Sequence, residues 1–295
     1  MHIVTSTRLT PQEAADVREM THAATLHDDL SPLSEHVMMR LQHGGENDLH
    51  FVARDDGHIV GYLHLDRTDL VSGAAVELVV HPKQRRRGIG SHLMAAALAQ
   101  AGDTSLRLWA HGELHGAYEL AASLGYRKTR ELWQMRRSLF AQLPHGSCPP
   151  GVTIRTFQVG LDEDALLAAN AQAFAQHPEQ GQLSTRDLEL RMSEPWFDSQ
   201  GLLLAVRDDR IVGFHWTKVH SGQTSDVGEI YVLGVVPDER GTGLGAYLAI
   251  RGLEHLRDRG LGTVMLYVDA DNTAATRMYS SLGFMHWDTD VMFGR

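Results

Sequence analysis

Cysteine is nearly absent from this chain of 295 residues. Its single cysteine, Cys148, cannot form an internal disulfide, which fits a reducing compartment. Long hydrophobic runs are also missing. No apolar stretch approaches the roughly 18 residues of a membrane span, and the first residues do not resemble a signal peptide. We therefore expect a cytoplasmic protein without a membrane partner.

An excess of positive charge is missing too. The chain has 27 Lys and Arg against 37 Asp and Glu, a formal charge of −10, and a pI of about 5.9. Nucleic-acid binding needs clustered Lys and Arg, so no nucleic-acid partner is expected. A small cationic substrate remains compatible with this charge.

Metal-ligand patterns are absent although the sequence has 18 histidines. None shows a paired ligand spacing with a third partner, so we expect no metal. His215 and His220 alternate with apolar residues on one predicted strand, which favours packing in a core or cleft. Cys148 has no base near it in the sequence, which argues against a nucleophilic role.

What the sequence does contain is an internal duplication. Arg240 lies 155 positions after Arg85, and the two glycines and one leucine that follow each arginine, Gly88, Gly90 and Leu93 against Gly243, Gly245 and Leu248, keep the same offset. Residues 53–62 resemble 205–214, and residues 123–126 resemble 281–284 at an offset of 158. The Pro- and Gly-rich residues 143–151 fit a linker. We expect two domains, 1–146 and 147–295.

The second copy predicts a regular order of elements. Alternation and helical periodicity indicate strands at 152–157, 202–206, 211–218, 227–236, 263–268 and 285–293, and helices at 161–176, 243–259 and from Asn272 to Ser281. Asn272 can cap its helix, and Gly283 can take the position after the helix end. The first copy repeats this pattern less regularly.

A glycine loop follows the fourth strand of each copy. In residues 240–245, the glycines let a ligand approach the backbone, and the free N–H groups of the next helix suit a pyrophosphate. Such a loop alone could be a structural turn. A dinucleotide-binding fold would need it after the first strand of a βαβ unit.

Arg-x-x-Gly-x-Gly after a long strand, followed by Asn-x-x-Ala and Tyr-x-x-Leu-Gly-Phe, resembles the GNAT superfamily of acetyl-CoA-dependent N-acetyltransferases. The resemblance covers both halves and implies an α/β (α+β) fold of two tandem domains, each a mixed, mostly antiparallel sheet flanked by helices. It implies acetyl-CoA as cosubstrate. In the second copy the implied CoA contacts are Leu233, Gly234, Val235, Arg240, Gly241, Thr242, Gly243, Leu244, Gly245, Ala246, Asn272, Thr273, Ala274, Ala275, Thr276 and Arg277. In the first copy they are Leu78, Val79, Val80, Arg85, Arg86, Arg87, Gly88, Ile89, Gly90 and Ser91.

A narrower resemblance rests on residues 174–181, 213–218 and 228–235. Together with the tandem arrangement, they are similar to the mycothiol synthases, an actinobacterial family that acetylates the cysteinyl amine of a cysteine–glucosamine–inositol conjugate. This implies a small amine substrate, and we expect a monomer. The implied substrate contacts are Glu35, Glu179, Lys218, Glu229 and Tyr267. Without the resemblance, Glu179 could cap a turn, Lys218 could be a solvated strand end, and Glu35 could lie on an exposed helix face.

Amide formation from a thioester needs a base near the amine and an acid near the sulfur. Glu229, on the fourth strand, is the candidate base. Tyr279, about two turns after Asn272, is the candidate acid, because a phenol with a pKa near 10 can protonate a thiolate. Backbone N–H groups of the strand can stabilise the oxyanion. Tyr279 could otherwise be a core aromatic residue.

The duplication provides an internal control. Glu229 maps onto Ala74 at the offset of 155, and Tyr279 maps onto Ala121 at the offset of 158. Glu77 and Tyr118 lie three positions away from these places. We therefore expect a catalytically silent first domain that closes the substrate cleft, and its retained loop leaves acetyl-CoA binding open. Two alternatives stay open: acetylation of another amine, such as a peptide N-terminus or an aminoglycoside, and an acetyl-CoA sensor without turnover.

Overall fold

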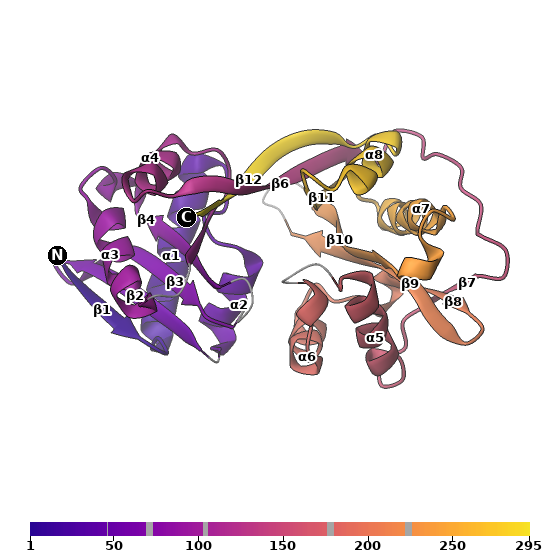
Figure 1. The fold of residues 1–295 in the computed structure, drawn as a ribbon, viewed down its shortest axis with the longest axis horizontal. Coiled ribbons are helices and arrows are strands. Elements are labelled where there is room, and N and C mark those ends of the chain that lie inside the picture. Colours follow the sequence, from indigo (N-terminus) through magenta and orange to yellow (C-terminus); the bar gives the residue numbers. More distant parts are fainter. Residues whose placement is uncertain (46, 69–72, 103–105, 176–179, 222–225) are drawn as a thin grey trace. The chain divides into compact units, whose positions relative to one another are not determined.

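The protein is described by a computed structural model that covers residues 1–45, 47–68, 73–102, 106–175, 180–221 and 226–295. Its contacts divide the chain into two compact units (Figure 1). Unit 1 comprises Met1–Leu132 and Asp288–Arg295, and unit 2 comprises Trp133–Trp287.

Unit 1 is a mixed sheet with the strand order β1-β2-β3-β4-β5-β12. Only the β4–β5 pair is parallel among the pairs with a defined register in this unit. The elements are β1 (His2–Ser6), α1 (Pro11–Asp28), α2 (Glu35–His43), β2 (Asp48–Asp55), β3 (His58–Asp66), β4 (Ala74–Val80), η1 (Pro82–Gln84), α3 (Ile89–Ala101), β5 (Leu106–Ala110), α4 (His115–Ser123) and β12 (Met285–Gly294).

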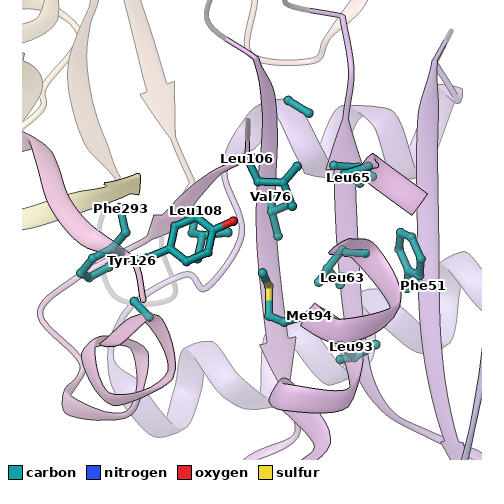
Figure 2. Packing of buried hydrophobic residues seen from close by; sticks show 14 of the residues in the cluster. Phe51, Leu63, Leu65, Val76, Leu93, Met94, Leu106, Leu108, Tyr126 and Phe293 are labelled. Atoms are coloured by element: carbon teal, nitrogen blue, oxygen red, sulfur yellow. The ribbon is translucent and has the colours of Figure 1, made fainter. Parts of the chain in front are cut away.

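Two apolar cores hold unit 1 together. On one face of the sheet, Leu93 and Met94 of α3 pack against strand residues such as Leu63 and Val76 (Figure 2). Phe293, near the carboxyl end of the chain, belongs to the same core. The second core joins residues of α1 and α2 to Val52, Tyr62 and Val79.

Unit 2 repeats this architecture with the strand order β6-β11-β10-β9-β8-β7, in which β10 and β11 are parallel. Its elements are the part of β6 (Arg127–Ser138) that begins at Trp133, β7 (Thr153–Thr156), α5 (Glu163–Ala173), η2 (Gln180–Gln182), α6 (Thr185–Ser193), η3 (Ser199–Gly201), β8 (Leu202–Arg207), β9 (Arg210–His220), β10 (Val227–Val235), η4 (Pro237–Glu239), α7 (Leu244–Asp258), β11 (Thr263–Asp269) and α8 (Thr273–Ser281). The predicted fold class is confirmed.

The division between the units differs from the predicted boundary near residue 147. Residues 133–287 form one unit, so the Pro- and Gly-rich segment 143–151 lies inside it. The physical reason is packing: Met135, Leu139 and Leu143 are buried in the core of unit 2, whereas Val291 and Phe293 are buried in unit 1. The last strand of the chain therefore completes the sheet of the first unit.

Most predicted elements of the second copy are present within a few residues. The apolar stripe of α7 is confirmed, because Leu244, Leu248, Leu253 and Leu256 are fully buried. The helix α6 was not predicted from the sequence. Its signal was the capping box of Ser184 and Asp187, in which each side chain accepts a hydrogen bond from the other residue's backbone N–H.

Candidate active site

The fourth and fifth strands of each unit separate part-way along their length. In unit 2 the parallel register runs from Gly228 to Ile230 of β10, although β10 continues to Val235. In unit 1 it ends at Val76, although β4 continues to Val80. This parting of strands four and five is thus present in both units. It gives a peptide-like ligand access to strand backbone.

A β-bulge distinguishes the two fourth strands. In β10 the register with β9 shifts between Ile230 and Val232, whereas the pairing of β3 with β4 is continuous. The bulge inserts one residue. Before the bulge, Glu229 pairs with Met265 of β11, and Ala75 pairs with Arg107 of β5. Met265 and Arg107 are 158 positions apart, the offset that also relates residues 281–284 to 123–126. Glu229 is therefore equivalent to Ala75, 154 positions earlier. The predicted match of Glu229 with Ala74 was wrong by one residue, but an alanine still stands in the first copy.

The glycine loops have the same backbone form in both units. Gly241 and Gly243 have φ values of +77° and +89°, and Gly88 has +80°. Arg86 adopts +65° at the place of Gly241. A Cβ on Gly241 or Gly243 would meet no atom within 4 Å. The loop of unit 2 thus leaves open space in front of the first turn of α7, as an anion site requires, whereas a Cβ on Gly88 would lie 3.5 Å from the His92 ring.

The first arginine of each loop has a structural contact. Arg240 donates to the backbone oxygens of Val235, at 3.4 Å, and Ala173, at 2.7 Å. Arg85 donates likewise to Val80, at 3.2 Å, and forms a bidentate pair with Asp28 at 2.8 and 2.5 Å. These guanidinium groups fasten the loop to the end of strand four.

Unit 1 contains a pocket of about 990 Å³ at its parted strands. Its wall combines Leu78–Val80 of β4 and residues 108–111 at the end of β5 with Gly88–Ser91 and residues of α4. Its size reaches the upper end of ligand-pocket volumes. Nine of the ten residues predicted as CoA contacts in the first copy line this pocket; Arg87 does not. Ala121 also lines it, where unit 2 has Tyr279.

Glu229 is buried on β10, directly across from Lys218 of β9. Its Oε2 lies 2.6 Å from Nε2 of His220. The Lys218 ammonium lies 4.6 Å from the ring centre of Trp196 and 5.2 Å from that of Tyr231. Glu229, Lys218 and His220 share one face of the sheet, because directly opposed residues and next-but-one neighbours point the same way. A carboxylate and an ammonium thus converge beside the parting of β10 and β11.

Tyr279 lies on α8 and is buried in the apolar core of unit 2, with its ring 5.7 Å from that of Phe284. Burial raises the pKa of its phenol above the usual value of 10.0. The hydroxyl therefore stays protonated at neutral pH, as an acid must. The predicted cap of α8 is confirmed: Asn272 Oδ1 accepts a hydrogen bond from Ala275 N–H at 3.1 Å, and Gly283 has a φ of +84°. Residues 273–277 form the first turns of this helix.

The other predicted substrate contacts belong to different elements of the chain. The Tyr267 hydroxyl, on β11, accepts a hydrogen bond from Gln134 Nε2 at 2.8 Å. Glu35 begins α2 in unit 1 and is half-buried. Glu179 lies outside the described residues.

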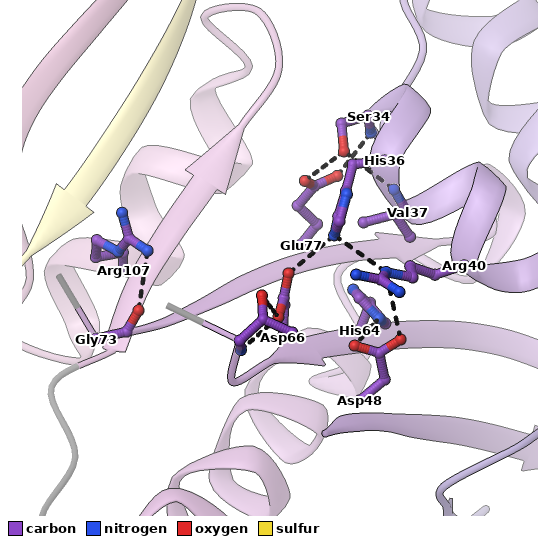
Figure 3. Close-up of polar contacts among 11 residues, drawn as sticks. Ser34, His36, Val37, Arg40, Asp48, His64, Asp66, Gly73, Glu77 and Arg107 are labelled. Carbon is purple, nitrogen blue, oxygen red and sulfur yellow. Dashed lines mark hydrogen bonds and ion pairs between the residues drawn. The ribbon is translucent and has the colours of Figure 1, made fainter. Parts of the chain in front are cut away.

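A polar network that the sequence did not predict occupies unit 1. Glu77 accepts hydrogen bonds from Ser34 N–H, at 2.6 Å, and from its hydroxyl, at 2.7 Å (Figure 3). His111 lies 3.2 Å from Glu77 and 2.9 Å from Asp290 of β12. Burial opposes the charge on Glu77, but His111 and Ser34 lower its pKa to about 2. Burial likewise opposes the charge on His111, but Asp290 and Glu77 raise its pKa to about 10.

The remaining histidines of interest separate into two kinds. His215 is fully buried and lies 2.8 Å from the Leu248 carbonyl, which agrees with the predicted packing role. His220 instead contacts Glu229, a pairing that spacing on one strand could not reveal. No group of three side chains able to hold a metal occurs among the described residues. Nor does that part of the chain contain a helix both long and apolar enough to span a membrane.

Comparison with known proteins agrees with this geometry. The acetyltransferase (GNAT) family model matches residues 169–284, and an acetyltransferase (GNAT) domain model matches residues 46–128. A mycothiol acetyltransferase of Thermobispora bispora is 50% identical over 98% of this chain and 98% of its own length. That of Acidothermus cellulolyticus is also 50% identical, over 98% of this chain and 93% of its own. The chain belongs to the mycothiol acetyltransferase family.

Solved structures extend the comparison beyond the mycothiol acetyltransferases. A GCN5-related N-acetyltransferase from Sphaerobacter thermophilus aligns with a TM-score of 0.69 and 26% identity, covering 99% of this chain and 95% of its own. A tandem GNAT protein from the clavulanic acid biosynthesis pathway aligns with a TM-score of 0.74 at 21% identity, covering 100% and 98%. The second likeness shows the tandem fold alone.

Proposed function

We propose that this chain transfers the acetyl group of acetyl-CoA to the cysteinyl amine of the cysteine–glucosamine–inositol conjugate, the last step of mycothiol biosynthesis. Membership of the mycothiol acetyltransferase family supports the reaction. The assignment of the site rests on Glu229, whose buried carboxylate lies next to the point where β10 and β11 separate.

Acetyl-CoA, when bound, supplies the activated thioester carbonyl. Glu229 accepts the proton of the attacking amine, and backbone N–H groups of β10 beyond the bulge donate to the developing oxyanion. Tyr279 then protonates the departing thiolate, for which its raised pKa keeps the proton available. Lys218, held against Trp196 and Tyr231, donates to hydroxyls or a carbonyl of the acceptor. The loop from Arg240 to Ala246 and the start of α8 hold the CoA phosphates.

We propose that the first domain binds acetyl-CoA without turning it over. Its pocket and its loop support binding. Ala75 and Ala121 stand in place of the proton-transfer pair, and the Glu77 carboxylate is engaged by Ser34 and His111. We also propose a cytoplasmic monomer without a nucleic-acid partner, in keeping with the charge of −10; light scattering at micromolar concentration tests the oligomeric state.

One assay separates the candidate functions. Free CoA is measured during incubation with acetyl-CoA and, in turn, the cysteinyl conjugate, a peptide with a free N-terminus and an aminoglycoside. The proposal expects release with the conjugate at a kcat/KM at least about 100-fold above that for the other amines, since a site built for polar groups rejects analogues strongly. Faster CoA release with another amine would identify that amine as the acceptor in place of the cysteinyl conjugate. No release with any amine would favour an acetyl-CoA sensor.

A further inference from the structure

The candidate base is in contact with a histidine near the surface. The Nε2 atom of His220 lies 2.6 Å from Oε2 of Glu229, a short distance for such a pair. The His220 side chain is 37% exposed, whereas that of Glu229 is 8% exposed. A buried carboxylate is thus bonded to a group that solvent reaches.

The strand register fixes this contact. Lys218 lies directly across from Glu229, so His220, two residues further along β9, is the diagonal neighbour on the same face. With Oε2 engaged by His220, the orientation of the carboxylate plane is restricted. Among the residues that the structure describes, no hydrogen bond is formed by Oε1. That oxygen is therefore available to accept a proton from a bound amine.

The first copy again serves as a control. Lys218 corresponds to Asp66, 152 positions earlier, because the two residues pair with Glu229 and Ala75, which are themselves equivalent. His220 therefore corresponds to Thr68. The first copy, which has Ala75 in place of Glu229, therefore also has no histidine in place of His220. The two copies also differ in the strands themselves, since β9 extends to His220 whereas β3 ends at Asp66.

We propose that His220 is a positioning residue for the base: its Nε2–H holds Oε2 of Glu229 so that Oε1 faces the acceptor amine. This inference rests on the proposed role of Glu229. It concerns orientation and adds no chemical step. It assigns His220 a role in kcat rather than in acetyl-CoA binding, because a misplaced base slows proton transfer without changing the cosubstrate site.

The test compares His220→Ala, His220→Gln and His145→Ala, a control at an exposed position, in steady-state assays with the cysteinyl conjugate and acetyl-CoA. We expect His220→Ala to lower kcat by roughly 10- to 100-fold, the scale on which partners that orient a functional side chain act. The KM for acetyl-CoA should stay within about twofold. The amide of His220→Gln can still donate to Oε2 and should restore much of the loss. His145→Ala should behave as wild type.

A double-mutant cycle separates positioning from a general structural role. If His220 acts through Glu229, then His220→Ala added to Glu229→Gln costs no further turnover. Wild-type kcat in a folded His220→Ala, or losses that multiply in the double variant, would overturn the inference. If Glu229→Gln itself keeps wild-type turnover, the proposed base is wrong, and that failure is distinct from the failure of His220.

Discussion

At the scale of single residues, burial and the neighbouring polar groups together decide which protonation state a buried side chain holds. Tyr279 is surrounded by apolar side chains, so its phenol keeps its proton. Glu77 is equally buried but is stabilised as an anion by His111 and Ser34, which lowers its pKa to about 2. Burial therefore keeps the Tyr279 phenol neutral, whereas the hydrogen bonds from Ser34 and the contact with His111 keep the buried Glu77 carboxylate ionised.

Glu229→Gln should reduce turnover of the cysteinyl conjugate by roughly 10²–10⁴-fold, because an amide cannot accept the proton of the amine. Acetyl-CoA affinity should change little, since the cosubstrate contacts are elsewhere. Steady-state kinetics and calorimetry with acetyl-CoA measure the two effects. Glu189→Gln, on the exposed side of α6, is the matched control. A Glu229→Gln enzyme with normal turnover would exclude this residue as the base.

Tyr279→Phe should lower kcat by roughly 100-fold, the range for loss of a general acid. The deficit should grow with pH, because solvent protons become scarce while the raised pKa of Tyr279 keeps the wild-type acid protonated. The pH dependence of kcat between 7 and about 9.5 checks this. A variant that changes acetyl-CoA affinity alone would show that the tyrosine is a packing residue.

At the scale of elements, the two units share the glycine loop and the helix that follows it, but their fourth strands differ. Both loops have residues at positive φ in front of a helix, a backbone form that is able to bind a phosphate. What differs is strand four: a bulge at Tyr231 interrupts β10, whereas β4 is continuous. Because a bulge redirects the side chains that follow it, strand four presents different residues in the two copies where it parts from strand five.

Gly243→Val and Gly88→Val form a matched pair of loop variants. Each places a branched side chain at a positive φ, +89° and +80°, and in the space in front of a helix N-terminus. Gly243→Val should abolish turnover by removing the productive acetyl-CoA site. Gly88→Val should keep most turnover but lower thermal stability in the presence of acetyl-CoA, since we propose that the ligand binds to the first domain and thereby stabilises it.

The pair is measured by turnover, calorimetry with acetyl-CoA and thermal melting with and without the ligand. Loss of turnover in a folded Gly88→Val protein would mean that the first domain takes part in catalysis or controls the second. Such a result would contradict the asymmetry proposed between the two copies.

At the scale of the whole molecule, the end of the chain completes the fold of its beginning. Asp290 of β12 pairs with His111, 179 positions earlier, and accepts a hydrogen bond from Gly112 N–H at 3.0 Å. With Val291 and Phe293, it ties the last strand to the sheet of unit 1. The integrity of the first pocket therefore depends on residues at the other end of the sequence.

The ion network should make the stability of unit 1 depend on pH. The pKa of Glu77 falls from 4.5 to about 2, so its contribution is complete above pH 4.5 and is lost towards pH 2. The pKa of His111 rises from 6.5 to about 10, so its contribution is complete below pH 6.5 and is lost as pH rises towards 10. Stability from this network is therefore greatest between pH 4.5 and 6.5.

His111→Gln should destabilise unit 1 by about 3 kcal/mol near pH 6, as removal of one partner from a buried ion pair does. It should also flatten the decline in stability between pH 6.5 and 10. Hydrogen exchange of the β4 and β5 amides measures the local free energy of opening, with the exposed His58→Gln as control. Equal pH dependence in wild type and His111→Gln would show that the network does not contribute to stability.

The sequence by itself determined the features that depend on neighbouring residues. The duplication, the glycine loops, the apolar stripe of α7 and the Asn272 cap each arise from short spacings, because helix periodicity, capping and positive φ are local properties. The same spacings pointed to Glu229 and Tyr279 and to alanines in the first copy. Tertiary structure alone decided the bulge at Tyr231, the division of strands between the units, and the contacts of His220 with Glu229 and of Asp290 with His111. Those features depend on the register between strands and on residues far apart in the chain, for which a single sequence carries no local signal.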